Sequence, residues 1–363
     1  MNPIVINGTV LCDNITGIPR YVYENVVRLD KLIEGTGLDV RIAYRDDGRP
    51  IHLPELKNIR LVPLKSIPYF YNLAVLPAYL RRTHAFYVGL ASDMLLTRRS
   101  VVVLHDIRPL VLDTDKGFFR FKFWVHCLST KWFAQRVFTV SDNQRHLISE
   151  KLGIPLDKIG ITYNGWEHMK NVTPDESIFD KMPGVTGSGR EAGKIYIAQD
   201  VDMVAKHKNF KWIREVARRS PDKTFVVAGG KDLRAFGDDA EAKDTHNVFY
   251  PGYVSDAENA ALMKHCKLFL HPAVFEGFGI PPLEALALGC YFAELTETVT
   301  ANATCLPELY GDTARYFDPY DYDVDLDALA AQPVAAPDEV LKKYSWDKTA
   351  EFWLHEMEKY ANQ

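Results

Sequence analysis

The chain has 363 residues, of which 47% are hydrophobic and 25% charged, and its formal net charge is −5. This length allows two domains, and this composition is that of a folded globular protein rather than a disordered chain. The acidic balance argues against a nucleic-acid-binding protein. No basic signal-peptide segment follows Met1, and no apolar stretch reaches membrane-spanning length, so we expect a cytoplasmic protein.

Charge is unevenly distributed along the chain. Residues 1–165 hold 22 Lys and Arg against 15 Asp and Glu, a net +7, whereas residues 166–363 hold 21 against 33, a net −12. A positive first half suits contact with the anionic inner face of the cell membrane, although scatter without function explains it equally well. The five scattered cysteines are odd in number and form no CxxC pair, which predicts free thiols and no structural zinc.

Strands and helices alternate in both halves of the chain, which predicts an α/β fold of parallel sheets covered by helices. In the first half we expect strands at 3–7, 39–44, 58–62, 101–104, 137–140 and 159–163, and helices at 19–32 and 117–136. In the second half we expect strands at 194–198, 223–228, 247–250 and 267–271, and helices at 208–219, 257–265 and 281–288. The latter part of 173–194 reads as a linker, and a last helix begins after Ser345, a good N-cap. Ligands of such sheets bind in a cleft at the carboxyl ends of the strands.

The most informative stretch is HPAVFEGFGIPPLEALALG, residues 271–289. It combines a strand end, a glycine turn and a helix N-terminus that begins with two prolines and closes at Gly289. The amides of Phe278, Gly279 and Ile280 then point along the helix axis, where the dipole favours an anion such as a phosphate.

Two carboxylates flank this anion site, Glu276 in the turn and Glu284 in the first helical turn. Because a carboxylate repels a phosphate, we expect both to accept hydrogen bonds from sugar or ribose hydroxyls. The alternative is a buried turn in which Glu284 only compensates the helix dipole.

EGFGIPPLE, with seven residues between the two glutamates, resembles the motif of the family-4 retaining glycosyltransferases of the GT-B fold, in particular bacterial surface-polysaccharide mannosyl- and rhamnosyltransferases. The motifs TGIPRY, HD, FTVS, YNG, HKN, PGYVSDAE and LPELYGD extend the resemblance over most of the chain, but residues 45–100 match nothing. The resemblance implies two Rossmann-like domains facing each other across a cleft. Residues 1–165 form the acceptor-side domain, to which a C-terminal helix at 345–363 crosses back, and residues 166–344 form the nucleotide-sugar-binding domain.

The resemblance also implies residue roles. Glu276 and His105 would lie at the donor sugar, and Glu284 would bind the ribose. The amides after Glu276 would hold the diphosphate, which the loop at Gly17 would approach, and the base would lie near Gly252 and Tyr253.

For three of the candidate residues the sequence leaves more than one role open. His105 ends a strand, where active-site groups gather, and its alternative is a structural role as the cap of the next turn. Asp106 would either orient His105 or contact the acceptor, and the sequence does not separate these roles. Arg20 is placed weakly on the acceptor side, because it is more often a surface residue of its helix.

Lys208 is the expected cation at the diphosphate, where it would stabilise the charge of the leaving group. The family has an arginine about six residues earlier, but Asp202 stands there in this chain. Either Lys206 replaces that arginine, or an insertion has shifted the loop, or the donor site is impaired.

We therefore expect a retaining hexosyltransferase that moves a hexose or deoxyhexose from a UDP-, GDP- or dTDP-sugar to a glycan or lipid-linked acceptor. No metal or other cofactor is expected, because Asp-x-Asp pairs arise by chance in an acidic chain. The alternative is a nucleotide-sugar or glycan-binding protein without transferase activity. A dehydrogenase is disfavoured because no GxGxxG follows the first strand.

The helix at 117–136 interleaves aromatic and basic residues, and a core helix is favoured over a membrane-surface helix.

Overall fold

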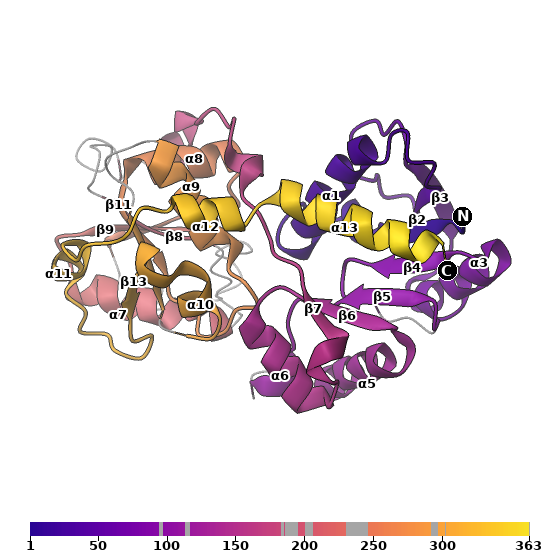
Figure 1. Cartoon of the computed structure of the whole chain (residues 1–363). Helices are drawn as coiled ribbons and strands as arrows, with labels where there is room; N and C mark the ends of the chain where they lie inside the picture. Colours follow the sequence, from indigo (N-terminus) through magenta and orange to yellow (C-terminus); the bar gives the residue numbers. More distant parts are fainter. Residues whose placement is uncertain are drawn as a thin grey trace. The chain divides into compact units, whose positions relative to one another are not determined.

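The structure is a computed structural model that describes residues 1–93, 97–112, 117–182, 185, 195–199, 206–229, 246–291, 297–301 and 303–362. The chain divides into two compact units, the first made of residues 1–165 and 344–363 and the second of residues 166–343 (Figure 1). Each unit has its own parallel sheet.

The first unit is built on a seven-stranded sheet with the strand order β3-β2-β1-β4-β5-β6-β7, in which all neighbouring strands are parallel. Its strands are β1 (Ile4–Asn7), β2 (Val40–Asp46), β3 (Arg60–Lys65), β4 (Phe86–Gly89), β5 (Ser100–Val103), β6 (Arg136–Thr139) and β7 (Ile159–Ile161). Its helices are α1 (Ile18–Leu32), α2 (Pro68–Phe70), α3 (Leu76–Thr83), α4 (Arg108–Val111), α5 (Phe118–Phe133), α6 (Asp142–Leu152) and α13 (Trp346–Ala361).

Helices cover both faces of this sheet. Successive side chains of a strand point to opposite faces, so a buried strand presents apolar groups to helices on each side. In β4, Tyr87 packs into a cluster with Leu80 of α3. The preceding residue, Phe86, stacks instead on Tyr360 of α13, with ring centroids 4.3 Å apart. The Ser345 hydroxyl caps α13 by accepting from the Lys348 amide, so the predicted N-cap is confirmed. The last helix therefore belongs to the core of the first unit, beside α1 (Figure 1).

The second unit is built on a six-stranded parallel sheet with the strand order β10-β9-β8-β11-β12-β13. Its strands are β8 (Ile195–Gln199), β9 (Thr224–Ala228), β10 (Val248–Gly252), β11 (Cys266–His271), β12 (Glu297–Ala301) and β13 (Arg315–Phe317). Its helices are α7 (Phe210–Arg219), α8 (Asp256–His265), α9 (Ile280–Tyr291), α10 (Leu306–Tyr310), α11 (Leu326–Ala330) and α12 (Asp338–Lys343). The same unit contains short 3-10 helices at Glu167–Met169 and Lys206–Lys208.

The predicted α/β class with two parallel Rossmann-like sheets is confirmed, and three local predictions are wrong. Helix α9 does not close at Gly289 but runs on to Tyr291. Helix α7 begins at Phe210 rather than at Lys208, because Asn209 adopts a left-handed conformation with φ 55°. Helix α5 is not a core helix: Phe118 is 80% exposed and Trp132 66%.

Two further findings concern the described residues only. Cys12, Cys127, Cys266 and Cys305 are buried free thiols, as predicted. Among the helices of the described ranges, none is both long and apolar enough to cross a membrane.

The carboxylate of Asp30 connects helix α1 to the segment just before β3. It accepts hydrogen bonds from the backbone amides of Lys57, Asn58 and Ile59 at 2.8–2.9 Å. Asp30→Ala removes three charge-assisted bonds and leaves amide donors unpaired, so we expect the free energy of unfolding to fall by about 3 kcal/mol. Glu34→Ala changes an exposed acid near the same helix end and should stay within about 0.5 kcal/mol of the parent. Urea unfolding followed by circular dichroism measures both, and equal midpoints for the two variants would refute this role of Asp30.

Candidate active site

The turn between β11 and α9 carries the motif with the two glutamates, and neighbouring segments hold it in place. The Val274 amide donates to the His207 carbonyl at 2.8 Å, and the Glu276 amide donates to the Thr304 hydroxyl at 3.2 Å. The Tyr310 hydroxyl donates to the Gly279 carbonyl. Gly279 has φ +85°, and a Cβ there would lie 2.9 Å from the Leu306 side chain, so only glycine fits without a shift.

Glu276 is a nearly buried carboxylate with cationic and imidazole groups beside it. Its Oε1 lies 3.0 Å from the Lys208 Nζ and 3.3 Å from the His271 Nε2. The side chains of Glu276 and Lys208 are 14% and 15% exposed. Burial by itself raises the pKa of Glu276, but Lys208 and His271 outweigh it, so its pKa is held well below the usual range. The turn therefore carries a negative charge near pH 7 at the carboxyl end of β11.

Lys208 and Lys206 differ in placement. Lys208 points to Glu276, whereas Lys206, two residues earlier in the same 3-10 helix, is exposed. Asn209 fixes the segment by donating from Nδ2 to the carbonyls of Pro272 and Pro319 at 3.2 and 2.8 Å. Asp202, which stands where the family has its arginine, lies outside the described residues.

Glu284, in the first turns of α9, meets two side chains that sequence analysis did not single out. Its Oε1 lies 2.9 Å from the His168 Nε2, and its Oε2 accepts from the Asn259 Nδ2 at 3.4 Å. Asn259 directly follows the PGYVSDAE motif, which was a usable signal. His168 comes from a 3-10 helix more than a hundred residues before Glu284, and no local pattern pointed to it.

His105 lies in the first unit at the carboxyl end of β5. Its Nε2 lies 2.8 Å from the Leu90 carbonyl, and its amide donates to the Ser92 hydroxyl at 3.2 Å. Burial lowers the pKa of His105 to about 4, so the ring is neutral near pH 7. Because a carbonyl only accepts, the proton sits on Nε2 and donates to Leu90, and the lone pair is left on Nδ1. The ring is therefore arranged to accept a hydrogen bond.

Asp93 anchors the turn that contacts His105. Its carboxylate accepts from the Asn7 Nδ2 at 2.8 Å and from the Tyr87 hydroxyl at 2.7 Å. Burial raises the pKa of Asp93 to about 6. Sequence analysis missed this residue, because the segment that contains it matches no family motif.

The other candidates in the first unit are Asp106, Arg20 and Gly17. The first two have partners in the structure, and the space around the third is empty. The Asp106 Oδ1 accepts from the amide of Arg108, the first residue of α4, at 3.0 Å. The Arg20 guanidinium lies 3.6 Å from the Glu24 carboxylate, one turn along α1. Gly17 is the N-cap of α1 with φ +56°, and nothing lies within 4 Å of a Cβ placed there.

In the second unit, Gly252 ends β10 with φ +77°, and its carbonyl accepts from the Gly229 amide at 2.9 Å. The next side chain, Tyr253, is 60% exposed, whereas the Phe278 side chain is buried. Gly279 and Ile280 mark the start of α9, as predicted.

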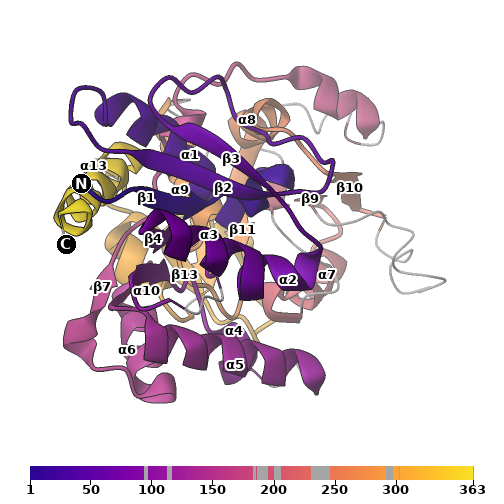
Figure 2. The same cartoon turned by 90° about the vertical axis from the view of Figure 1, so that its right-hand side faces the viewer.

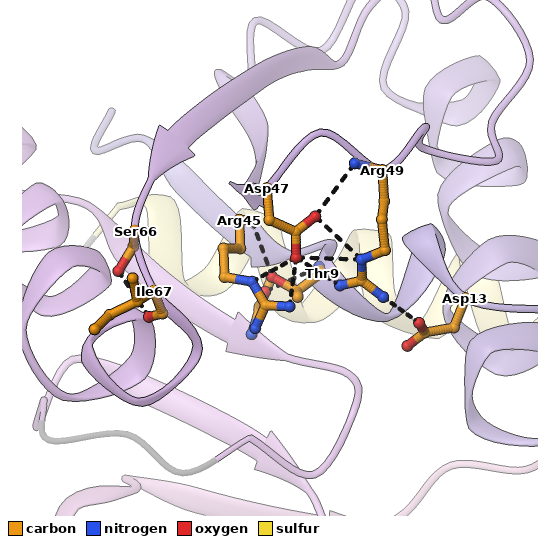
Figure 3. Close-up of polar contacts among 8 residues, drawn as sticks. Thr9, Asp13, Arg45, Asp47, Arg49, Ser66 and Ile67 are labelled. Carbon is orange, nitrogen blue, oxygen red and sulfur yellow. Dashed lines mark hydrogen bonds and ion pairs between the residues drawn. The ribbon is translucent and has the colours of Figure 1, made fainter.

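A charged network follows β2, within the stretch for which the sequence offered no resemblance. Figure 3 shows the guanidinium groups of Arg45 and Arg49 directed at the same Asp47 carboxylate, while Arg49 also reaches Asp13. The Arg45 amide donates to the Thr9 hydroxyl at 3.1 Å. These contacts order the loop at the carboxyl ends of β1 and β2. In the part of the chain that the structure describes, no group of three or more His, Cys, Asp or Glu is arranged to hold a metal ion.

Residues 192–308 match the family model described as "Glycosyl transferases group 1". We call this matched segment the group 1 domain. It contains Lys208, Glu276 and Glu284, together with Asn259.

Two curated relatives and one solved structure illustrate the similarity. The serotype-specific mannosyltransferase WbdA of Escherichia coli is 33% identical over 115 residues, which are 28% of this chain but only 13% of that relative. The O-antigen chain mannosyltransferase RfbU of Salmonella typhimurium is 25% identical over 274 residues, 73% of this chain and 69% of the relative. The crystal structure of HepE from Anabaena with UDP aligns with a TM-score of 0.68 at 14% identity, over 99% of this chain and 100% of that one. The group 1 domain thus sits in a chain with a GT-B-like fold.

The Glu276–Lys208 pair predicts a pH-dependent stability difference. A carboxyl whose pKa is depressed on folding contributes stability above its unfolded pKa, about 4.3, and loses it as the pH falls. Lys208→Met leaves the buried carboxylate without its lysine, so we expect the free energy of unfolding to fall by about 3 kcal/mol at pH 7. The loss should be smaller at pH 4, where Glu276 of the variant takes up a proton.

The control is Lys206→Met, which should change the stability by less than about 0.5 kcal/mol. The double variant Lys208→Met/Glu276→Gln should recover most of the loss, because no buried charge remains. A loss of equal size at pH 4 and pH 7 in urea unfolding would contradict this account of the pair.

Proposed function

We propose that this chain is a retaining glycosyltransferase that moves a hexose or deoxyhexose from a nucleotide-diphosphate sugar to a glycan or lipid-linked acceptor in polysaccharide biosynthesis. The observation that carries the proposal is the ion pair inside the group 1 domain between Glu276, in the turn before α9, and Lys208, in the 3-10 helix that precedes α7. Relatives named mannosyltransferases support a mannosyl group as the first sugar to test. HepE, solved with UDP and with UDP-glucose, supports a nucleotide-sugar donor.

Lys208 and the start of α9 are proposed to bind the diphosphate. An ammonium group has three N–H donors, so Lys208 can bind a phosphate oxygen while it stays paired with Glu276. The amides of Phe278, Gly279 and Ile280 lie at the start of a twelve-residue helix, whose dipole adds to the attraction for an anion. Lys206 is exposed and is assigned a weaker, outer contact.

The proposed reaction needs no external proton acceptor. The bond between the anomeric carbon and the phosphate oxygen breaks, and its electron pair stays on the diphosphate, where Lys208 stabilises the new charge. The acceptor hydroxyl attacks the same face of the sugar, and its proton passes to the leaving phosphate oxygen. The products are a glycoside and a nucleoside diphosphate. Glu276, whose charge is fixed by its low pKa, would stabilise the positive charge that develops on the sugar.

Glu284 is proposed to bind the ribose. A carboxylate has about four acceptor positions, and His168 and Asn259 occupy one on each oxygen, so two remain for ribose hydroxyls. Those two neighbours fix the orientation of the carboxylate before the nucleotide arrives. The exposed Tyr253 ring and the adjacent Gly252 are proposed to meet the base.

The first unit would contribute His105, whose Nδ1 is set up to accept a hydrogen bond from a sugar hydroxyl. The open position at Gly17 lets a phosphate approach the start of α1 closely. Asp106 and Arg20 remain weak candidates for the acceptor, because both already serve their own helices. We place the protein in the cytoplasm, in contact with the inner face of the cell membrane, where a lipid-linked acceptor is present.

Release of free nucleoside diphosphate tests the proposal. UDP-, GDP- and dTDP-sugars are first screened by thermal shift, because a ligand at 100 times its Kd stabilises a protein by about 2.7 kcal/mol. The stabilising donor is then incubated with and without a lipid-linked saccharide. Diphosphate release that depends on the acceptor supports a transferase. Binding without release under any acceptor would favour a nucleotide-sugar-binding protein instead.

Lys208 and Lys206 should differ in catalysis as they differ in placement. One donor to transition-state charge is worth about 2.7–4 kcal/mol, so Lys208→Ala should lower kcat roughly 100- to 1000-fold. Lys206→Ala should lower it by less than about tenfold. The reverse order of the two variants would show that Lys206 is the cation at the diphosphate.

Glu284→Gln should weaken the binding of the free nucleoside diphosphate and of the whole donor by the same factor, about tenfold, because both contain the ribose. Asn259→Asp, which puts a second carboxylate beside Glu284, should weaken both in parallel. Isothermal titration calorimetry measures all four affinities. If the Glu284→Gln protein binds the nucleoside diphosphate as tightly as the parent does, Glu284 does not bind the ribose.

A further inference from the structure

Helix α5 exposes a row of large aromatic side chains on the surface of the first unit. Phe118, Phe121 and Trp124 follow one another at intervals of three residues and are 80%, 57% and 46% exposed. Trp132, two four-residue steps beyond Trp124, is 66% exposed. Residues three and four apart lie on the same side of a helix, so these four rings form one stripe, which we call the aromatic stripe.

The opposite side of α5 packs against the first unit. Cys127 is fully buried and packs with Val137 of β6 and Ile148 of α6. Figure 1 and Figure 2 both show α5 at the outer border of its unit, next to α6. The buried side thus anchors the helix, and the aromatic stripe is left facing outward.

The charge of α5 has one sign. The helix contains Arg120, Lys122 and Lys131 and no acidic residue. Such a combination is typical of a helix that lies in a membrane interface, where rings enter the acyl boundary and cations stay at the headgroups. An interface between proteins is expected to be depleted in lysine, which makes a second protein the weaker match.

A surface cavity opens beside the stripe. It has a volume of about 460 Å³ and is lined by Phe121, Trp124 and Leu110 together with the basic side chains of Arg120 and Lys151. Arg120 already donates to the Leu110 carbonyl at 3.2 Å, and Lys151 pairs with the Glu150 carboxylate at 2.9 Å. A guanidinium has five N–H donors and an ammonium three, so both can also bind a phosphate whose ester chains continue into an apolar layer. The cavity therefore matches the headgroup of an anionic phospholipid in both charge and apolar character.

We propose that the aromatic stripe of α5 docks this protein on an anionic phospholipid membrane, with a lipid phosphate in the cavity between Arg120 and Lys151. The inference assigns a named helix to the membrane contact of the proposed function and rests on that function only for the location. Donor binding by the group 1 domain does not depend on it.

The first experiment measures binding of the full chain to vesicles by co-sedimentation. Vesicles of phosphatidylcholine alone are compared with vesicles of equal parts phosphatidylcholine and phosphatidylglycerol. We expect at least tenfold stronger binding to the anionic vesicles, decreasing as salt is added. Equal binding to both, or none to either, would overturn the proposal.

Variants then test whether α5 is the docking element. The triple variant Phe118→Ser/Phe121→Ser/Trp132→Ser should weaken binding to anionic vesicles at least tenfold, and Arg120→Gln/Lys122→Gln should reduce its dependence on salt. Phe70→Ser removes an aromatic ring that is 58% exposed on α2 of the same unit and should leave binding unchanged. Thermal shift with the donor should be equal in all variants, which separates this test from that of the proposed function.

Two further readouts keep the result specific. Vesicles with brominated acyl chains should quench the fluorescence of the parent protein, and Trp124→Leu/Trp132→Leu should remove that quenching. Sedimentation velocity detects the other occupant of the stripe, a second copy of this chain. A parent dimer that becomes a monomer in the triple variant, with vesicle binding unchanged, would overturn the membrane assignment.

Discussion

A carboxylate that is nearly buried keeps its charge only if cations compensate its lost hydration, and this constraint organises the second unit around Glu276. Lys208 supplies the compensation, so the short helix that carries it must lie close to the turn after β11. The Val274–His207 backbone bond and the two carbonyl contacts of Asn209 maintain that approach. Segments about seventy residues apart are thus held in one geometry by a single ion pair and the bonds around it.

The local part of the site was predictable, because its determinants lie side by side in the sequence. Two glycines, two prolines and a run of helix formers around Glu276 and Glu284 specify a strand end, a turn and a helix start, and the structure has all three. The partners of Glu284 were not predictable in the same way. His168 reaches it from a distant 3-10 helix, and only the packing of α9 brings the two together. The helix start after Lys208 was misplaced by two residues, because the left-handed Asn209 is imposed by its tertiary bonds to two carbonyls.

The alternation of strands and helices predicted the fold class well, since period-two and helical patterns depend only on neighbouring residues. This alternation did not predict which side of α5 packs against the rest of the first unit. Aromatic residues occur all around that helix, so its pattern fits a core helix and a surface helix alike. The structure separates them through Cys127, which packs inward, and Phe118, which does not. The two lysines and one arginine of α5 were the better signal, because these residue types are almost never fully buried in a core.

The turn that holds His105 shows why a structural partner does not argue against a functional role. Ser92 has φ 56°, a left-handed conformation that costs a residue other than glycine about 1–3 kcal/mol. The buried charge of Asp93, in the same turn, adds a desolvation cost that its bonds to Asn7 and Tyr87 offset only in part, as its raised pKa indicates. If the turn only connected β4 to β5, neither the backbone strain at Ser92 nor the desolvation of Asp93 would be needed. Here they are sustained together, in the turn whose Ser92 hydroxyl and Leu90 carbonyl accept from the amide and the ring of His105. The proposed contact between the His105 Nδ1 and a sugar hydroxyl gives this turn a reason to keep both costs.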